Sequence, residues 1–235
     1  ISIEFPIALD NESVQFVIYD TPGTDSNYLA HQQVLSEALE KQSQSILIFV
    51  AKPDGLEGSG NNALLNYLKV AEMKNSKTSI DIGRSLFVIN KADAQTADVR
   101  ITLQQQEIKN EDDENFSIKL ADKKLFFTSA LYAYAAKAVS NEIATPNEKG
   151  IFEGGKYTLA LEQNPMGYCY RQDRCATSKH ATERLQQKCE DALKEAQAEG
   201  NSAKILEICS GIYALEREIL VYGEKYASAV KAFAI

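Results

Sequence analysis

Three short runs of apolar residues set the strongest limit on how this chain can fold. They occupy residues 46–50, 85–89 and 124–128, and helical patterns separate them along the chain. Strands that are apolar on both faces are typical of parallel sheets, because the crossover helices of such sheets cover both sides. The pattern therefore predicts an α/β fold with a mostly parallel sheet and helices on both faces.

Other segments complete the predicted sheet and its helices. Residues 1–9 and 13–19 are rich in β-forming residues and flank a polar turn, which predicts an antiparallel hairpin at the edge of the sheet. Apolar residues at helical spacing predict further elements. These helices cover residues 27–41, 63–73, 96–109 and 131–140, with a Gly-rich loop at 52–62 and an acidic loop at 111–114.

The alternation stops after residue 140. Residues 141–178 are polar and contain several Gly and Pro residues, whereas 179–198 predict a helix that is charged almost all round and solvated. Residues 203–234 predict a long helical stretch, with a break and restart at Ser210 and Gly211. We therefore expect one main domain formed by residues 1–140 and 209–235, and a polar, helical insertion at 141–208.

Composition excludes several classes of protein. The net charge of −8 and the pI near 5.0 argue against a nucleic-acid partner, because phosphate binding needs a basic surface. No apolar run reaches the roughly 18 residues of a membrane span. All four cysteines lie in the last third of a chain with no signal-like start, which favours reduced thiols and a cytoplasmic location.

The first motif with a chemical interpretation is Asp20-Thr21-Pro22-Gly23, at the end of the second β-rich run. A carboxylate at a strand end can hold Mg²⁺, usually through water. The glycine allows close approach of the backbone, so the N–H of Gly23 could meet a terminal phosphate oxygen. An ordinary strand-to-helix turn with an Asp cap explains this motif alone equally well.

The second motif is Asn90-Lys91-Ala92-Asp93, which follows the strand at 85–89. Guanine has two adjacent donors, and an ionised Asp93 can accept both. The stem of Lys91 can lie along the base, and Asn90 can tie neighbouring loops together through its amide.

A third and weaker motif, Thr128-Ser129-Ala130, follows the strand at 124–128. There the N–H of Ala130 could face the guanine carbonyl, and Ser129 could equally be a plain helix N-cap. Ligands of open parallel sheets bind beyond the carboxyl ends of the strands, where all three motifs are expected.

Together these motifs resemble the guanine-nucleotide-binding superfamily, and within it the dynamin-like large GTPases. The resemblance rests on four segments and covers most of the chain, with residues 141–209 matching least. The segments are residues 17–26, 88–93, 128–131 and 210–216. It implies a P-loop NTPase-type sheet and an enzyme that hydrolyses GTP to GDP and phosphate. The main domain would then be the nucleotide-binding domain.

The resemblance also assigns roles to residues. Asp20 would be the catalytic, magnesium-side aspartate and Gly23 the sensor of the γ-phosphate, while Asn90, Lys91 and Asp93 would read guanine. Ser129 and Ala130 would complete the base site, with the Ala130 N–H as donor. Homodimerisation across the nucleotide face is a further property of the family, and so is membrane association, which would depend on segments that this sequence lacks.

A phosphate loop with its lysine, and a first-switch threonine, are expected before the hairpin but are not found there. We therefore expect an N-terminally truncated domain with little GTPase activity by itself. Residues 150–157 do match Gly-x-x-x-x-Gly-Lys, but no apolar strand precedes them and Tyr157 replaces the Ser or Thr that holds Mg²⁺. A Gly-rich surface loop is the simpler interpretation. The alternative for the whole chain is a noncatalytic interaction or scaffold domain with a degenerate GTPase fold.

Overall fold

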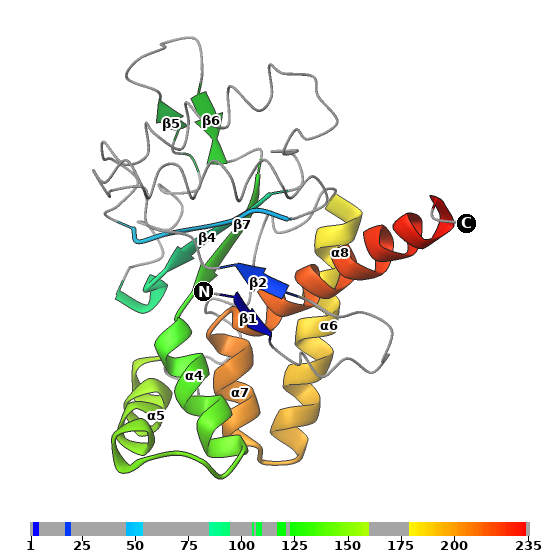
Figure 1. The fold of residues 1–235 in the computed structure, drawn as a ribbon. Coiled ribbons are helices and arrows are strands. Elements are labelled where there is room, and N and C mark those ends of the chain that lie inside the picture. Colours follow the sequence, from blue (N-terminus) through cyan, green and yellow to red (C-terminus); the bar gives the residue numbers. More distant parts are fainter. Residues whose placement is uncertain are drawn as a thin grey trace.

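The computed structural model describes residues 2–4, 17–19, 46–53, 85–94, 105, 107–109, 117–120, 123–159 and 179–233 (Figure 1). At its centre lies a three-stranded parallel sheet in the order β3-β4-β7. The strands are β3 (Ile48–Ala51), β4 (Leu86–Asn90) and β7 (Lys124–Thr128). All three apolar runs thus form the parallel strands that the sequence predicts.

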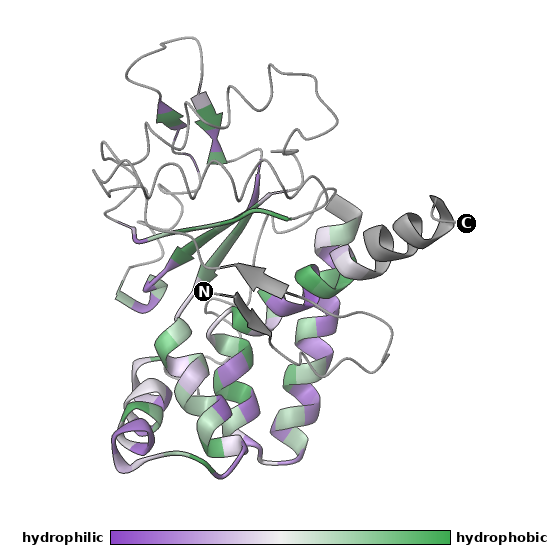
Figure 2. Cartoon of the chain, in the orientation of Figure 1, coloured by the Kyte–Doolittle hydropathy of each residue, from purple (hydrophilic) through white to green (hydrophobic). Residues whose placement is uncertain are grey.

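Side chains on both faces of this sheet are buried, which explains why the strands are apolar throughout. On one face, Leu86, Val88 and Phe126 belong to a buried cluster shared with the C-terminal helices. On the other face Phe87 is 1% exposed, and its ring centroid lies 5.6 Å from that of Phe49. Figure 2 shows the resulting hydrophobic band along β4 and β7.

In the part of the chain that the structure describes, five helices follow β7 and pack next to one another (Figure 1). They are α4 (Ala130–Ser140), α5 (Pro146–Thr158), α6 (Lys179–Ala198), α7 (Ser202–Cys209) and α8 (Ile212–Phe233). Helix α4 lies between α5 and α7, and its buried positions are all alanines, which let its neighbours approach closely. The predicted break at Ser210 and Gly211 is confirmed, since α7 ends and α8 begins there.

The prediction of a Gly-rich surface loop at 150–157 is wrong, because these residues lie inside α5. Thr145 accepts a hydrogen bond from the Glu148 N–H, and the Glu148 side chain accepts one from the Thr145 N–H, which forms a capping box. Pro146 occupies the first helical turn, where a missing N–H costs nothing. The helix also buries Phe152 against the core, so packing and capping outweigh its three glycines.

The cap of α5 is also linked to α4. The Tyr134 hydroxyl donates to the Glu148 carboxylate, and this bond, followed by those from Thr145, lowers the pKa of Glu148. The same bond raises the pKa of Tyr134. The start of α5 is therefore fixed against α4 by a charge-assisted hydrogen bond.

Helix α6 has the predicted bounds but is not solvated all round. A narrow stripe of buried side chains runs along it and joins the core, in the order Thr182, Leu185, Cys189, Leu193 and Ala196. The spacing of three and four residues is that of one helix face. Charged and polar residues occupy most of the other positions, so the segment reads as charged almost all round and its sequence does not reveal the stripe. Neither Cys189 nor Cys209 in α7 forms a disulfide.

Two antiparallel pairs complete the described structure. Strands β1 (Ser2–Glu4) and β2 (Val17–Tyr19) form the predicted antiparallel pair. Within the described residues this pair is a separate two-stranded sheet and not an edge of the central one, and the predicted turn between the strands lies outside those residues. Strands β5 (Glu107–Lys109) and β6 (Ser117–Lys119) form another antiparallel pair. The predicted helix at 96–109 is therefore wrong at its end, because Ile108 pairs with Ile118 and both are buried.

Several other predictions lie outside the described residues. They concern the helices at 27–41 and 63–73, the start of the helix at 96–109, most of the loop at 52–62, and the acidic loop at 111–114. The division into a main domain and an insertion at 141–208 stays a prediction. The buried cluster does join sheet residues to helices from both sides of that boundary.

Candidate functional site

The candidate site lies at the carboxyl ends of β4 and β7. These strands are parallel neighbours, and their last residues, Asn90 and Thr128, are direct partners in the register. Strand β3 ends at the same edge, since Ala51 pairs with Ile89. The Asn90-to-Asp93 motif and the Thr128-to-Ala130 motif are therefore brought together by the sheet, although about forty residues separate them in the sequence.

The segment after β4 makes a tight turn with an unusual backbone. Lys91 has φ 61°, in the left-handed region that residues other than Gly seldom adopt. Its carbonyl accepts a hydrogen bond of 3.2 Å from the Ala94 N–H, and the buried Ala92 anchors the turn in the core. A short 3₁₀ helix, Ala92–Ala94, carries Asp93 in its first turn. Strained backbone of this kind is concentrated at functional sites.

Asn90 joins the two motifs directly. Its side-chain oxygen accepts a hydrogen bond of 3.0 Å from the Ala130 N–H and one of 3.4 Å from the Thr128 hydroxyl. The predicted role of Asn90 in tying neighbouring loops is therefore seen in the structure. The Ala130 N–H, which sequence reasoning assigned to a base, is engaged by Asn90 here.

Ser129 links the same loop, residues 128–130, to a second part of the chain. It occupies the N-cap position of α4, but its side chain makes no capping hydrogen bond. Instead, its backbone N–H donates to the Ser210 carbonyl over 2.8 Å, and both residues are almost fully buried. Sequence reasoning recognised Ser210 and Gly211 as a helix break, but not as part of the site. No local pattern reveals this contact, because it joins residues 81 positions apart.

The side chains of this edge differ in exposure. Lys91 and Lys52 are exposed, Asp93 and Asn90 are half-buried, and Ser129 is buried. The half-buried carboxylate of Asp93, two residues after the exposed Lys91, can accept hydrogen bonds from a ligand at the rim while remaining open to solvent. This edge of the sheet thus has a carboxylate acceptor, a lysine with an aliphatic stem and a cationic end, and backbone N–H groups held in hydrogen bonds.

The phosphate-side residues cannot be placed in the same way. Asp20 and Gly23 lie outside the described residues, although the strand before them, β2, forms as expected. Within the part of the chain that the structure describes, no group of three or more His, Cys, Asp or Glu side chains is arranged to hold a metal ion. Likewise, none of the helices described there is long and apolar enough to cross a membrane.

Comparison with protein-family models, with curated proteins and with solved structures found no match for this chain.

Proposed function

We propose that this chain is the GTP-binding domain of a dynamin-like GTPase, a cytoplasmic enzyme that hydrolyses GTP in the intact protein. The observation that carries the proposal is the link from Asn90 to Thr128 and Ala130. It joins the loops after two adjacent parallel strands by hydrogen bonds, at the edge where such sheets bind their ligands. The residue that joins the loops, Asn90, is also the one to which the guanine motif assigns this role.

Guanine would be read by the turn after β4. Asp93 would accept hydrogen bonds from the ring N1–H and the exocyclic amine, and a carboxylate makes such bonds charge-assisted. The exposed stem of Lys91 would lie along the base, and the left-handed backbone at Lys91 sets the direction in which that stem leaves the strand. We expect the guanine carbonyl to compete with Asn90 for the N–H of Ala130.

The phosphate side of the proposal rests on the sequence motif alone. Asp20 would act on the magnesium side and Gly23 at the γ-phosphate. Catalysis of phosphoryl transfer consists mostly of positioning and of charge stabilisation. The base site, in contrast, can be tested on this chain without turnover.

Calorimetric titration with GDP, ADP and xanthosine diphosphate tests the base site. Hydrogen bonds to a charged group contribute about 1.5–3 kcal/mol, so we expect GDP to bind roughly 10-fold to 100-fold more tightly than ADP. Asp93→Asn replaces two acceptor oxygens with one acceptor and one donor. Because xanthine has a carbonyl where guanine has an amine, this variant should lose affinity for GDP and gain affinity for xanthosine diphosphate.

A matched control is Asp191→Asn on α6, which removes a carboxylate whose side chain is 63% exposed and lies outside the candidate site. It should leave all three affinities unchanged. Equal affinity for GDP and ADP, or an Asp93→Asn variant with unchanged preference, would refute the guanine site. Failure to bind any nucleotide would leave the noncatalytic interaction domain as the alternative.

A further inference from the structure

The break between α7 and α8 has a specific hydrogen-bonding arrangement. Gly211 has φ 81°, and its N–H donates to the Ile208 carbonyl over 3.1 Å, as in a common helix C-terminal motif. The Ser210 hydroxyl donates to the Glu207 carbonyl over 2.6 Å and accepts from the Ile212 N–H at 3.4 Å. The Ser210 hydroxyl therefore bridges the end of α7 and the start of α8.

This arrangement redirects the Ser210 carbonyl. In an uninterrupted helix that carbonyl would accept from the N–H four residues later. At the break it accepts instead from the Ser129 N–H, over 2.8 Å. Ser210 is fully buried and Ser129 is 1% exposed, so water does not compete for the bond. A buried hydrogen bond of this kind is costly to break, because each partner would be left unsatisfied.

The loop 128–130 is thus held from two sides by residues that are distant in the sequence. The Asn90 side-chain oxygen accepts a hydrogen bond from the Ala130 N–H, and the Ser210 carbonyl accepts one from the Ser129 N–H. Helix α8 also contacts the start of β7, where Lys124 pairs with Glu218 at 2.9 Å. The loop after β7 is therefore bonded to the junction of α7 and α8 through Ser210, and the start of β7 is bonded to α8 through Glu218.

We propose that Ser210 and Gly211 are positioning residues for the guanine-binding loop 128–130, and that a nucleotide bound at this loop is coupled to the junction of α7 and α8. The proposal rests on the proposed function for the identity of the ligand. The positioning itself is a statement about the protein without nucleotide, so the two can fail separately.

The coupling is tested on the unmodified chain by hydrogen–deuterium exchange with mass spectrometry. GDP at saturating concentration should slow exchange in peptides covering residues 126–132 and also in peptides covering 207–213. ADP at the same concentration should do neither. Protection of 126–132 by GDP with unchanged exchange at 207–213 would overturn the coupling.

The positioning is tested with a pair of glycine variants. Gly211→Ala places a side chain at φ 81°, and the control Gly200→Ala does the same at φ 66° in the turn before α7, where an added Cβ meets nothing within 4 Å. Without nucleotide, exchange in 126–132 should accelerate in Gly211→Ala but not in Gly200→Ala. Equal exchange in both variants would overturn the positioning role, whatever the chain binds.

Base selectivity separates positioning from general destabilisation. Coupling between sites typically changes affinity about fivefold or more, so Gly211→Ala should reduce the ratio of GDP affinity to ADP affinity by at least about fivefold. Gly200→Ala should keep the wild-type ratio. If Gly211→Ala does not fold, the exchange experiment on the unmodified chain still decides the coupling. If the unmodified chain shows no preference for GDP, the proposed function fails, and the nucleotide-free exchange comparison still decides the positioning role.

Discussion

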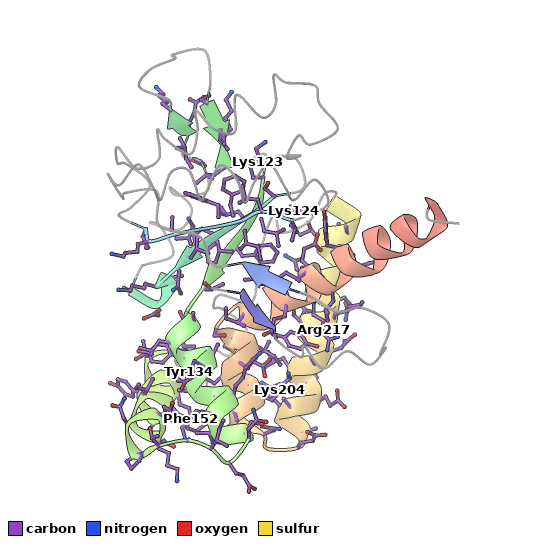
Figure 3. All side chains as sticks on the ribbon, in the orientation of Figure 1. Lys123, Lys124, Tyr134, Phe152, Lys204 and Arg217 are labelled. Atoms are coloured by element: carbon purple, nitrogen blue, oxygen red, sulfur yellow. The ribbon has the colours of Figure 1, made fainter. Side chains whose placement is uncertain are left out.

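The ion pair between Lys124 and Glu218 is the contact whose removal we expect to cost the most stability. It joins the first residue of β7, Lys124, which Figure 3 labels, to α8. The Lys124 Nζ lies 2.9 Å from the Glu218 Oε1. The two side chains are only 8% and 9% exposed. Neither charge can therefore recover much hydration if its partner is removed.

Lys124→Met keeps most of the side-chain length and removes the charge. Breaking a buried pair by removing one partner costs about 3–5 kcal/mol, because the remaining charge stays buried. For a domain of this size about 1 kcal/mol corresponds to 2–4 °C, so the melting temperature should fall by about 6–20 °C. Glu218→Leu should have a cost in the same range, since it leaves the ammonium group buried.

The double variant, Lys124→Met with Glu218→Leu, should recover nearly all of this loss. Removing both charges also removes both desolvation penalties, and apolar replacements of buried pairs are often neutral or stabilising. We therefore expect its free energy of unfolding to lie within about 1 kcal/mol of the wild-type value. The two single effects would then be non-additive by several kcal/mol.

Urea denaturation followed by circular dichroism measures all four free energies of unfolding. The control is Lys194→Met, which breaks a pair with Asp191 at 3.9 Å whose side chains are 65% and 63% exposed. It should change the free energy of unfolding by less than about 0.5 kcal/mol. A Lys124→Met cost below about 1 kcal/mol, or additive single effects, would refute the reasoning.

Three further predictions concern the C-terminal helices. Gly150→Ala and Gly154→Ala should each raise the free energy of unfolding by about 0.5–1 kcal/mol, because an added Cβ meets nothing within 4 Å. Gly155→Ala should lower the free energy of unfolding by about 1–3 kcal/mol, because its Cβ would lie 2.7 Å from the Tyr132 ring. Thermal melts that rank the three variants alike would contradict this. Burial raises the pKa of the Cys189 thiol from 9.0 to about 12, so the native thiol should react with a disulfide reagent at pH 8 about 1000-fold more slowly than an exposed one. Since the unfolded thiol ionises first, stability should be unaffected below pH 9 and should fall by about 1.4 kcal/mol per pH unit between pH 9 and 12; an unchanged slope in Cys189→Ala would show that other groups cause the loss.

The elements that the sequence predicted well are those whose burial is uniform. Leu86 to Ile89 are buried on both faces of the sheet, so every residue of the strand carries the same signal. Residues 107–109 show the opposite case, with one buried residue between two exposed ones. Three residues are too few for a period, and the pairing of Ile108 with Ile118 depends on a strand formed later in the chain.

Helix α5 was missed although its start was readable. The Thr145-Pro146-Asn147-Glu148 segment has the spacing of a capping box, but the glycines that follow have low helix propensity. Propensity is a local average, whereas the helix is stabilised by Phe152 in the core and by Gly155, whose missing side chain makes room for Tyr132. Tertiary packing decided between the two signals.

For the candidate site, the sequence by itself determined the residue types and their places at the ends of strands. It predicted Asn90, Lys91 and Asp93 from the donors and acceptors that a guanine site would need, and it predicted a helix break at Ser210 and Gly211. Only the tertiary structure decided that the Asn90 side-chain oxygen accepts a hydrogen bond from the Ala130 N–H, and that the Ser210 carbonyl accepts one from the Ser129 N–H. The physical reason is that each bond joins groups brought together by sheet register and helix packing, and long-range geometry of that kind leaves no pattern in neighbouring residues.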